Sequence, residues 1–113
     1  MGTPVVLREL SERDLPLIER LWQLYSHDMS EVRRTLPNAE GLFKPGRLPG
    51  YLGDPDCRGY VVTYQDAPVG FAFVVGVSGP LRRMGDFFVA RGVRRQGIAS
   101  QMAKALLARH PGR

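Results

Sequence analysis

The chain has 113 residues, which is the length of one domain, and its 43% hydrophobic and 24% charged residues are typical of a globular protein. No apolar run approaches the roughly 20 residues of a membrane-spanning helix, and the first residues lack the basic and apolar regions of a secretion signal. A single cysteine, Cys57, excludes an internal disulfide and a cysteine-based zinc site. We therefore expect one cytoplasmic domain over residues 1–113.

The positive charge is concentrated at one end of the chain. Residues 1–81 have a net charge of −2, whereas residues 82–113 hold eight arginines and lysines and a single acid, Asp86, for a net charge of +7. This asymmetry predicts an anionic partner for the C-terminal end, and nucleic acid, a phosphorylated cofactor and an acidic protein all satisfy it. The alternative, to which the charge alone gives about equal weight, is a solvated basic surface.

The N-terminal half is predicted to form a strand, a helix and a long loop. Residues Val5–Leu10 favour a strand, and Ser11 with Asp14 three residues later is typical of a helix start. The helix is expected to run to about residue 30, because apolar side chains recur at helical spacing at Ile18, Leu21, Trp22, Tyr25 and Met29. Residues 31–44 are compatible with a second short helix, before or after Pro37, but do not predict one. The prolines and glycines of Lys44–Gly59 predict a loop.

The C-terminal half is predicted to form three strands and a helix. Tyr60–Tyr64, Val69–Val77 and Met84–Val89 are rich in β-branched and aromatic residues, and tight turns separate them. This order favours an antiparallel meander. A basic loop follows, and then a helix over Gly97–Arg109. The expected fold class is α+β, with a mostly antiparallel sheet flanked by helices.

Residues 86–100 hold most of the chemical information in the sequence. They combine an apolar strand, an arginine-rich loop and a helix that begins with small residues. A helix N-terminus offers free backbone N–H groups to an anion, Gly97 and Ala99 leave room for its approach, and Arg94 and Arg95 add forked donors. The pattern predicts a phosphate or pyrophosphate site. The less favoured alternative is an ordinary strand-to-helix connection with its arginines in solvent.

The same residues resemble a known family. Arg94-Arg95-Gln96-Gly97-Ile98-Ala99 matches the Gln/Arg-x-x-Gly-x-Gly/Ala signature of the GNAT acyltransferase superfamily, and the upstream order of elements is similar to the first two-thirds of that fold. The resemblance implies acetyl-coenzyme A (acetyl-CoA) as acyl donor, with CoA as product. It also implies direct acetyl transfer to an amine of a small molecule or peptide, without an acyl-enzyme.

The resemblance also assigns cofactor-binding residues. In the family, the backbone of the fourth strand pairs with the pantetheine arm, and backbone N–H groups of the signature loop and following helix hold the pyrophosphate. The positions implied here are Phe87, Phe88, Val89, Arg94, Arg95, Gln96, Gly97, Ile98, Ala99 and Ser100.

Asp86 is the candidate catalytic residue. An amine must lose a proton to attack, and Asp86 is the only acid near the predicted cofactor site. The alternative, which the sequence favours over catalysis, is an exposed strand carboxylate that balances Arg82 or Arg83. Near the end of the first helix, His27 is expected to face solvent and Tyr25 to lie in the core. Cys57, expected in a loop, has no identifiable partner base and is not expected to act as a nucleophile.

The resemblance stops where the chain stops. The family normally continues after the phosphate-binding helix with a further strand and helix, and that part commonly supplies a tyrosine that protonates the leaving thiolate. We expect that the chain is truncated at its C-terminus. A second copy that completes the sheet by pairing or strand exchange is the alternative.

Two other functions remain open from the sequence. One is a non-catalytic CoA-binding module with a GNAT-like fold. The other is a nucleic-acid-binding domain that uses the basic C-terminal helix, which is disfavoured because the aromatic residues lie in apolar runs rather than on a stacking surface. No membrane partner and no metal ligand set is expected.

Overall fold

A computed structural model describes residues 5–79, 82–93 and 97–110. The main elements, in chain order, are β1 (Val5–Glu9), α1 (Leu15–Arg33), α2 (Leu48–Gly53), β2 (Cys57–Tyr64), β3 (Ala67–Val75), β4 (Arg83–Val89) and α3 (Ile98–Arg109). Short 3-10 helices, η1 (Glu12–Asp14) and η2 (Arg91–Val93), precede α1 and follow β4. None of the helices within these ranges is long and apolar enough to cross a membrane.

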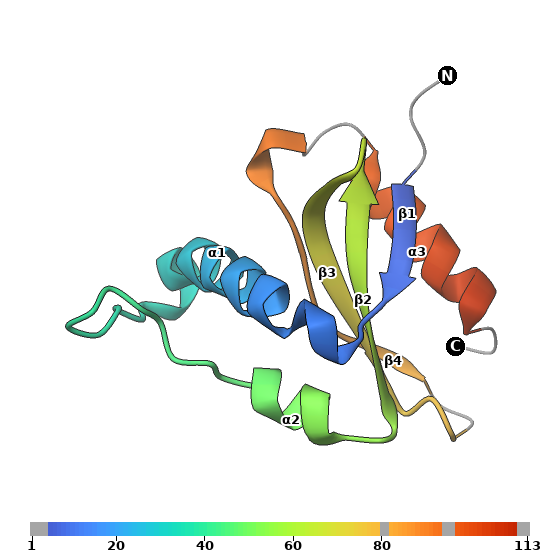
Figure 1. The fold of residues 1–113 in the computed structure, drawn as a ribbon, viewed down its shortest axis with the longest axis horizontal. Helices are drawn as coiled ribbons and strands as arrows, with labels where there is room; N and C mark the ends of the chain where they lie inside the picture. Colours follow the sequence, from blue (N-terminus) through green and yellow to red (C-terminus); the bar gives the residue numbers. More distant parts are fainter. Residues whose placement is uncertain (1–4, 80–81, 94–96, 111–113) are drawn as a thin grey trace.

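The four described strands form one antiparallel sheet in the order β1-β2-β3-β4, so the predicted meander and the α+β fold class are confirmed. Helices α1 and α2 cover one face of this sheet, and α3 lies against the other (Figure 1). This three-layer arrangement follows from the alternation of side chains along each strand, which gives the sheet two apolar faces to bury.

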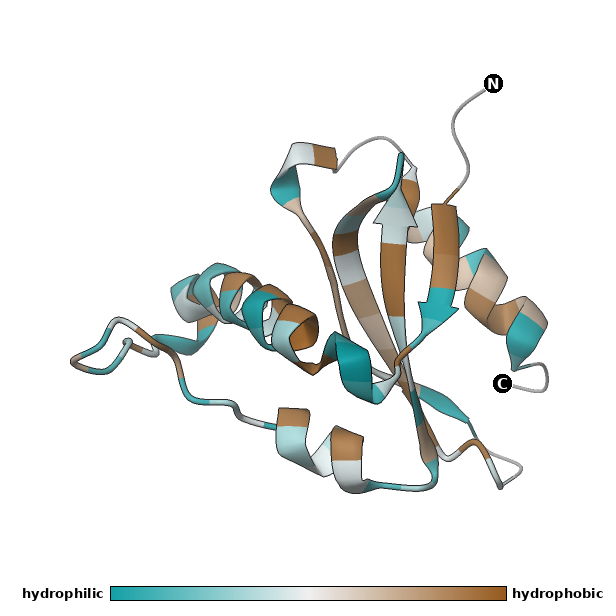
Figure 2. Ribbon diagram, viewed as in Figure 1, coloured by the Kyte–Doolittle hydropathy of each residue, from teal (hydrophilic) through white to brown (hydrophobic). Residues whose placement is uncertain are grey.

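The two faces have different cores. On the α3 side, Ile98, Met102 and Leu106 pack against the sheet, as their helical spacing predicts. On the α1 side the core is rich in aromatic residues. For example, Trp22 stacks on Phe71 with ring centroids 5.3 Å apart. Hydrophobic residues run along the strands and the sheet-facing sides of the helices (Figure 2). Burying each large apolar side chain contributes about 1.5–3 kcal/mol to stability.

A small polar cluster caps η1, the short 3-10 helix that leads directly into α1. The Asp14 carboxylate accepts a hydrogen bond from the Ser11 backbone N–H at 3.0 Å and pairs with the Arg8 guanidinium at 2.6 Å. These contacts hold the pKa of Asp14 below its usual value. The predicted helix start is therefore confirmed. The helix continues to Arg33, slightly beyond the expected end, and stops at Arg34 in the left-handed conformation.

The segment between α1 and β2 differs from the prediction. Residues 34–44 contain no helix, whereas the region expected to be a loop contains α2. Pro49 lies in the first turn of α2, where its missing N–H costs no hydrogen bond, and Leu48 is buried against the aromatic core. Burial therefore stabilises a helix that local propensity disfavours. The placement of Cys57 in a loop is also wrong, because it is the first, buried residue of β2.

Strand β4 contains a bulge at Gly85 and Asp86. Ala72 pairs with Phe87 and Val74 pairs with Met84, so β4 has one more residue than β3 between these pairs. A bulge bends the strand locally and redirects a side chain. Asp86 is one of the two β4 residues within this interval, and its side chain is buried on the α1 side of the sheet.

Candidate functional site

Asp86 lies at the centre of a buried polar cluster. Tyr25 from α1 donates a hydrogen bond of 2.8 Å to Asp86 Oδ1, and Tyr51 from α2 donates one of 3.1 Å to Oδ2. The Asp86 backbone N–H in turn donates to Tyr51 Oη at 3.0 Å. Three elements therefore position one carboxylate, and each of its oxygens keeps an acceptor site for a further partner.

The two tyrosines are held rigidly by the aromatic core. Tyr51 stacks on Phe73 with ring centroids 4.5 Å apart, and Tyr25 packs edge-on against Phe71. Burial, together with the nearby carboxylate, raises the pKa of Tyr25 to about 12. Tyr25 therefore keeps its proton at physiological pH and remains a hydrogen-bond donor to Asp86.

The burial of Asp86 corrects one of the two sequence interpretations. The sequence favours an exposed strand carboxylate, but only 9% of the residue is accessible to solvent. Besides the tyrosines, the Arg47 guanidinium lies 3.9 Å from Oδ1. Its burial and its hydrogen-bond partners on two other elements make Asp86 a candidate functional residue.

A cavity of about 420 Å³ opens beside Asp86. We call it the Asp86 cavity. Helix α1 and the segment between α1 and α2 form its walls, and Asp86 is the one described lining residue that comes from the sheet. Its volume lies within the range of small-molecule sites. A ligand in this cavity therefore reaches the carboxylate from the α1 side of β4.

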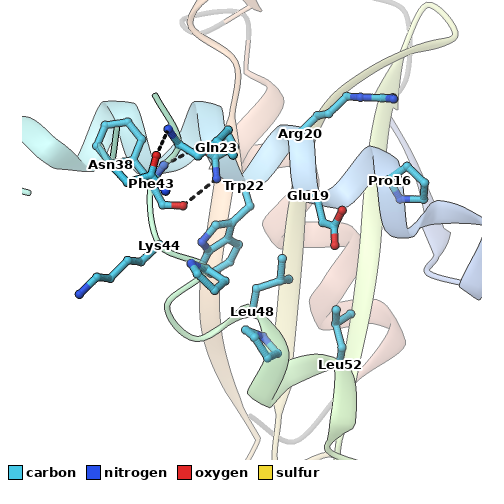
Figure 3. A pocket seen from close by; sticks show the side chains of 13 residues that line it. Pro16, Glu19, Arg20, Trp22, Gln23, Asn38, Phe43, Lys44, Leu48 and Leu52 are labelled. Carbon is cyan, nitrogen blue, oxygen red and sulfur yellow. Dashed lines mark hydrogen bonds between the residues drawn. The ribbon is translucent and has the colours of Figure 1, made fainter. Parts of the chain in front are cut away.

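The wall segment is fastened to α1 by one side chain. The Gln23 amide donates to the Phe43 carbonyl oxygen at 2.9 Å and accepts from the Phe43 N–H at 2.8 Å (Figure 3). Figure 3 also shows a second cavity, of about 710 Å³, between α1 and α2. We call this pair of hydrogen bonds between Gln23 and Phe43 the Gln23 clamp. Both cavities are lined by Trp22, Phe43 and Lys44, so the clamp affects the shape of each cavity.

The cofactor-binding residues implied by the resemblance fall into three groups in the structure. Phe87, Phe88, Val89 and Ala99 come together along a groove of about 280 Å³, which Tyr25, Asp28 and Met29 of α1 complete. We call it the β4 groove. It joins the end of β4 to the first turn of α3. The groove and the Asp86 cavity have Met29 in common, and Asp86 directly precedes Phe87.

The remaining positions surround the start of α3. Gly97 has a φ of +76°, and nothing described lies within 4 Å of the place where its Cβ would be, so the backbone faces open space. Ile98 is buried in the core and offers only its backbone, whereas Ser100 is exposed. The predicted residues Arg94, Arg95 and Gln96 lie outside the described residues.

Other polar and titratable groups have defined positions in the structure. Arg91, just after β4, pairs with Asp28 of α1 at 3.0 Å beside the β4 groove. His27 is exposed, as expected. Burial raises the pKa of Cys57 to about 11, so its thiol stays protonated at neutral pH. Within the described ranges, no group of three or more His, Cys, Asp or Glu residues is placed to hold a metal ion.

Three functional candidates were not found by sequence reasoning. Tyr51 and Arg47 lie in the proline- and glycine-rich stretch that predicts a loop, so nothing local indicates that they reach β4. Gln23 has no pattern that distinguishes it from other polar residues of α1. Their importance depends on tertiary contacts at separations of 20 residues or more.

Comparison with known proteins identifies the family. The sequence matches the model of the acetyltransferase (GNAT) family over residues 18–113. The chain therefore belongs to the GNAT acetyltransferase family, as its signature predicts. No match was found among curated protein sequences.

Solved structures share the fold at low sequence identity. An acetyltransferase from Thermus thermophilus is 19% identical, with a TM-score of 0.71 over 96% of this chain and 71% of that chain. An aminoglycoside acetyltransferase from an uncultured soil metagenomic sample, in complex with sisomicin, is 20% identical, with a TM-score of 0.66 over 94% and 69%. The ribosomal-protein-S18-alanine N-acetyltransferase from Escherichia coli is 13% identical, with a TM-score of 0.64 over 93% and 58%.

Proposed function

We propose that this protein transfers an acetyl group from acetyl-CoA to an amine, with Asp86 as the base. The single observation that carries the proposal is the buried Asp86 carboxylate, which lines the Asp86 cavity and accepts hydrogen bonds from Tyr25 and Tyr51, directly before Phe87 of the β4 groove. Family membership supports acetyl transfer as the reaction. The single cysteine agrees with the cytoplasm as the compartment.

The β4 groove fits the donor. The backbone of Phe87 to Val89 would hold the pantetheine arm, and the N–H groups from Gly97 to Ser100 would hold the pyrophosphate, to which Arg94 and Arg95 add charge. The open space at Gly97 and the small side chain of Ala99 leave room for an anion at this corner. When bound, acetyl-CoA supplies the acetyl group as a thioester.

The Asp86 cavity fits the acceptor. In the proposed reaction the acceptor nitrogen forms a bond to the acetyl carbonyl carbon, and the bond from that carbon to sulfur breaks. Overall an ammonium ion and the thioester yield an amide, the thiol and one proton. The nitrogen gives up two protons in total: Asp86 accepts one and passes it to solvent, and the other ends on the sulfur of the leaving thiolate. Tyr25 and Tyr51 hold the Asp86 carboxylate in place.

The direct test is acetyl transfer by the full chain. The protein is incubated with acetyl-CoA and a panel of amines, thiol release is followed spectroscopically, and the acetylated product is identified by mass spectrometry. The proposal predicts amine-dependent thiol release that saturates in both substrates. Absence of product with every amine, at protein concentrations that detect one turnover per hour, would contradict it.

The same samples distinguish the alternative functions. Tight CoA binding in calorimetry without acetyl transfer would indicate a CoA-binding module. Binding to polynucleotide that weakens steeply with salt and persists in excess CoA would indicate a nucleic-acid-binding domain. We also propose that a second copy can complete the sheet beside β4, which sedimentation of the full chain would reveal as a dimer.

A further inference from the structure

The Asp86 cavity is lined by an excess of positive charge. Among the described residues that line it, the charged side chains are three cations, Arg33, Lys44 and Arg47, and one acid, Asp86. The acid is already hydrogen-bonded by two tyrosines and lies within 3.9 Å of Arg47. A ligand that enters the cavity therefore meets three cations and one acid, so positive charge is in excess.

The cations are placed to act on a ligand. Arg33, the last residue of α1, lies with its guanidinium 5.9 Å from the centre of the Tyr25 ring, so it stands close to the partner of Asp86. Arg47 exposes 72% of its side chain, which leaves guanidinium donors accessible. Lys44 follows directly after Phe43, which Gln23 fastens to α1. The positive charges are thus spread around the cavity.

The rest of the lining is largely apolar. Trp22 and Met29 of α1 and Phe43 of the opposite wall present ring and thioether surface to the cavity. The volume of about 420 Å³ accommodates a ligand of amino-acid or dipeptide size. This lining of apolar side chains, one acid and three cations matches a compact molecule that combines an amine, an anionic group and some apolar surface.

From these features we propose that the acceptor is an amine whose own skeleton carries an anionic group, either a carboxylate or a phosphate. This inference rests on the proposed function, since it places the reacting amine beside Asp86. The anionic group would then bind Arg33, Lys44 or Arg47, for which forked and charged donors suit both anions. Polyamines and other multiply charged cations would be repelled by the same three residues.

The inference is tested with matched ligands and a binding readout. Calorimetry in saturating CoA compares L-phenylalanine with L-phenylalaninamide, and phosphoethanolamine with ethanolamine, so that each pair differs in its anionic group. Spermine serves as the polycation. We expect at least one anionic member to bind about tenfold or more tightly than its partner, the size of one charge-assisted contact, and spermine to bind weakest.

Variants assign the preference to the cavity. Arg47→Gln and Lys44→Gln, made separately, should each reduce the preference for the anionic ligand several-fold while thermal melting confirms the fold. Lys104→Gln is the matched control, because Lys104 is an exposed cation on α3 on the opposite face of the sheet. Its ligand preference should remain that of the unaltered protein.

The outcomes separate this inference from the proposed function. Anionic preference that the cavity variants lose, without any acetyl transfer, supports the binding of an anionic amine in the Asp86 cavity but contradicts the enzymatic function, and with it the assignment of that amine as acceptor. Acetyl transfer to spermine or to the uncharged amines, with no anionic preference, overturns the inference and leaves the function standing. A preference that Lys104→Gln removes as strongly as Arg47→Gln also overturns it, because the effect would then be one of overall charge.

Discussion

Asp86 is the residue on which the proposed chemistry depends most. Two tyrosines from different helices donate to its carboxylate, and the β4 bulge lies at its position in the strand. A buried carboxylate is costly unless such partners satisfy it. A proton-accepting role toward a ligand in the Asp86 cavity would explain why a carboxylate occupies this buried position.

Replacing Asp86 tests this role directly. Asp86→Asn keeps the size of the side chain but removes its ability to accept a proton, so kcat is expected to fall about 10²- to 10⁴-fold. The difference in kcat between Asp86→Asn and the unaltered protein should become smaller as the pH rises toward the pKa of the acceptor amine, because more of the amine then binds in its neutral form. Thiol-release kinetics from pH 6 to 10 measure both effects. A variant with unaltered kcat would exclude Asp86 as the base.

Gly85 provides a second test next to Asp86. A Cβ at this position would lie 2.7 Å from Tyr51 Oη and 3.0 Å from Cζ, so Gly85→Ala should displace Tyr51 from the carboxylate. We expect a loss of about tenfold or more in kcat with little effect on CoA affinity. Gly50→Ala in α2 is the control, because open space surrounds it and alanine stabilises a helix by about 0.5–1 kcal/mol. Equal kinetics for the two variants would show that Tyr51 does not position Asp86.

At the scale of elements, the site depends on how the segment between α1 and α2 is attached. This segment is long and has no helix of its own before α2, yet it forms one wall of the Asp86 cavity. The Gln23 side chain of α1 donates one hydrogen bond to the Phe43 backbone and accepts another from it, as a neighbouring strand would. The attachment fixes where Lys44, the next residue, projects.

Loss of this clamp should affect acceptor binding more than chemistry. Gln23→Ala removes both hydrogen bonds, so we expect a loss of about 1–2 kcal/mol in the free energy of unfolding and a several-fold higher KM for the acceptor. The kcat should change little, because Asp86 and its tyrosines are untouched. Leu24→Gln, at an exposed neighbouring position, is the control. A lower kcat with unaltered KM would contradict this account.

At the scale of the whole molecule, the stability should depend on acid pH through Asp14. Its pKa is lowered in the folded protein by Arg8 and Ser11, so the unfolded state binds a proton more readily. The stabilisation is present above the unfolded pKa of about 4 and is lost as the pH falls through the lower, folded value. Asp14→Asn should therefore lower stability near pH 6 and flatten its decline toward pH 3.

Urea denaturation at both pH values measures this effect. The expected loss near pH 6 is about 1–2 kcal/mol, since Arg8 exposes 47% of its side chain and solvent screens the pair. Glu40→Gln, at an exposed position, is the control. Parallel pH dependence in Asp14→Asn and the unaltered protein would contradict the assignment.

The sequence predicts the parts of the fold that local patterns encode. The order of helices and strands follows from two local patterns. One is the alternation of side chains in the strands, and the other is the apolar helical stripe of Ile18, Leu21, Trp22 and Tyr25. Helix α2 is not predictable in this way, because burial of Leu48 rather than propensity stabilises it. The partner of Asp86 on that helix, Tyr51, is missed for the same reason. A cofactor site could be proposed from the sequence because the signature residues are contiguous, whereas the residues around the Asp86 cavity come from distant positions in the chain.

The measurement that tests the central claim most directly is calorimetric titration of the full chain with CoA. The account predicts saturable binding at one site, lost in Ala99→Glu, which places bulk and negative charge in the β4 groove, and retained in Ala103→Glu, one helical turn farther along α3. Unaltered affinity in Ala99→Glu, or no heat at millimolar CoA with the unaltered protein, would contradict the claim that the groove between β4 and α3 holds the acyl donor.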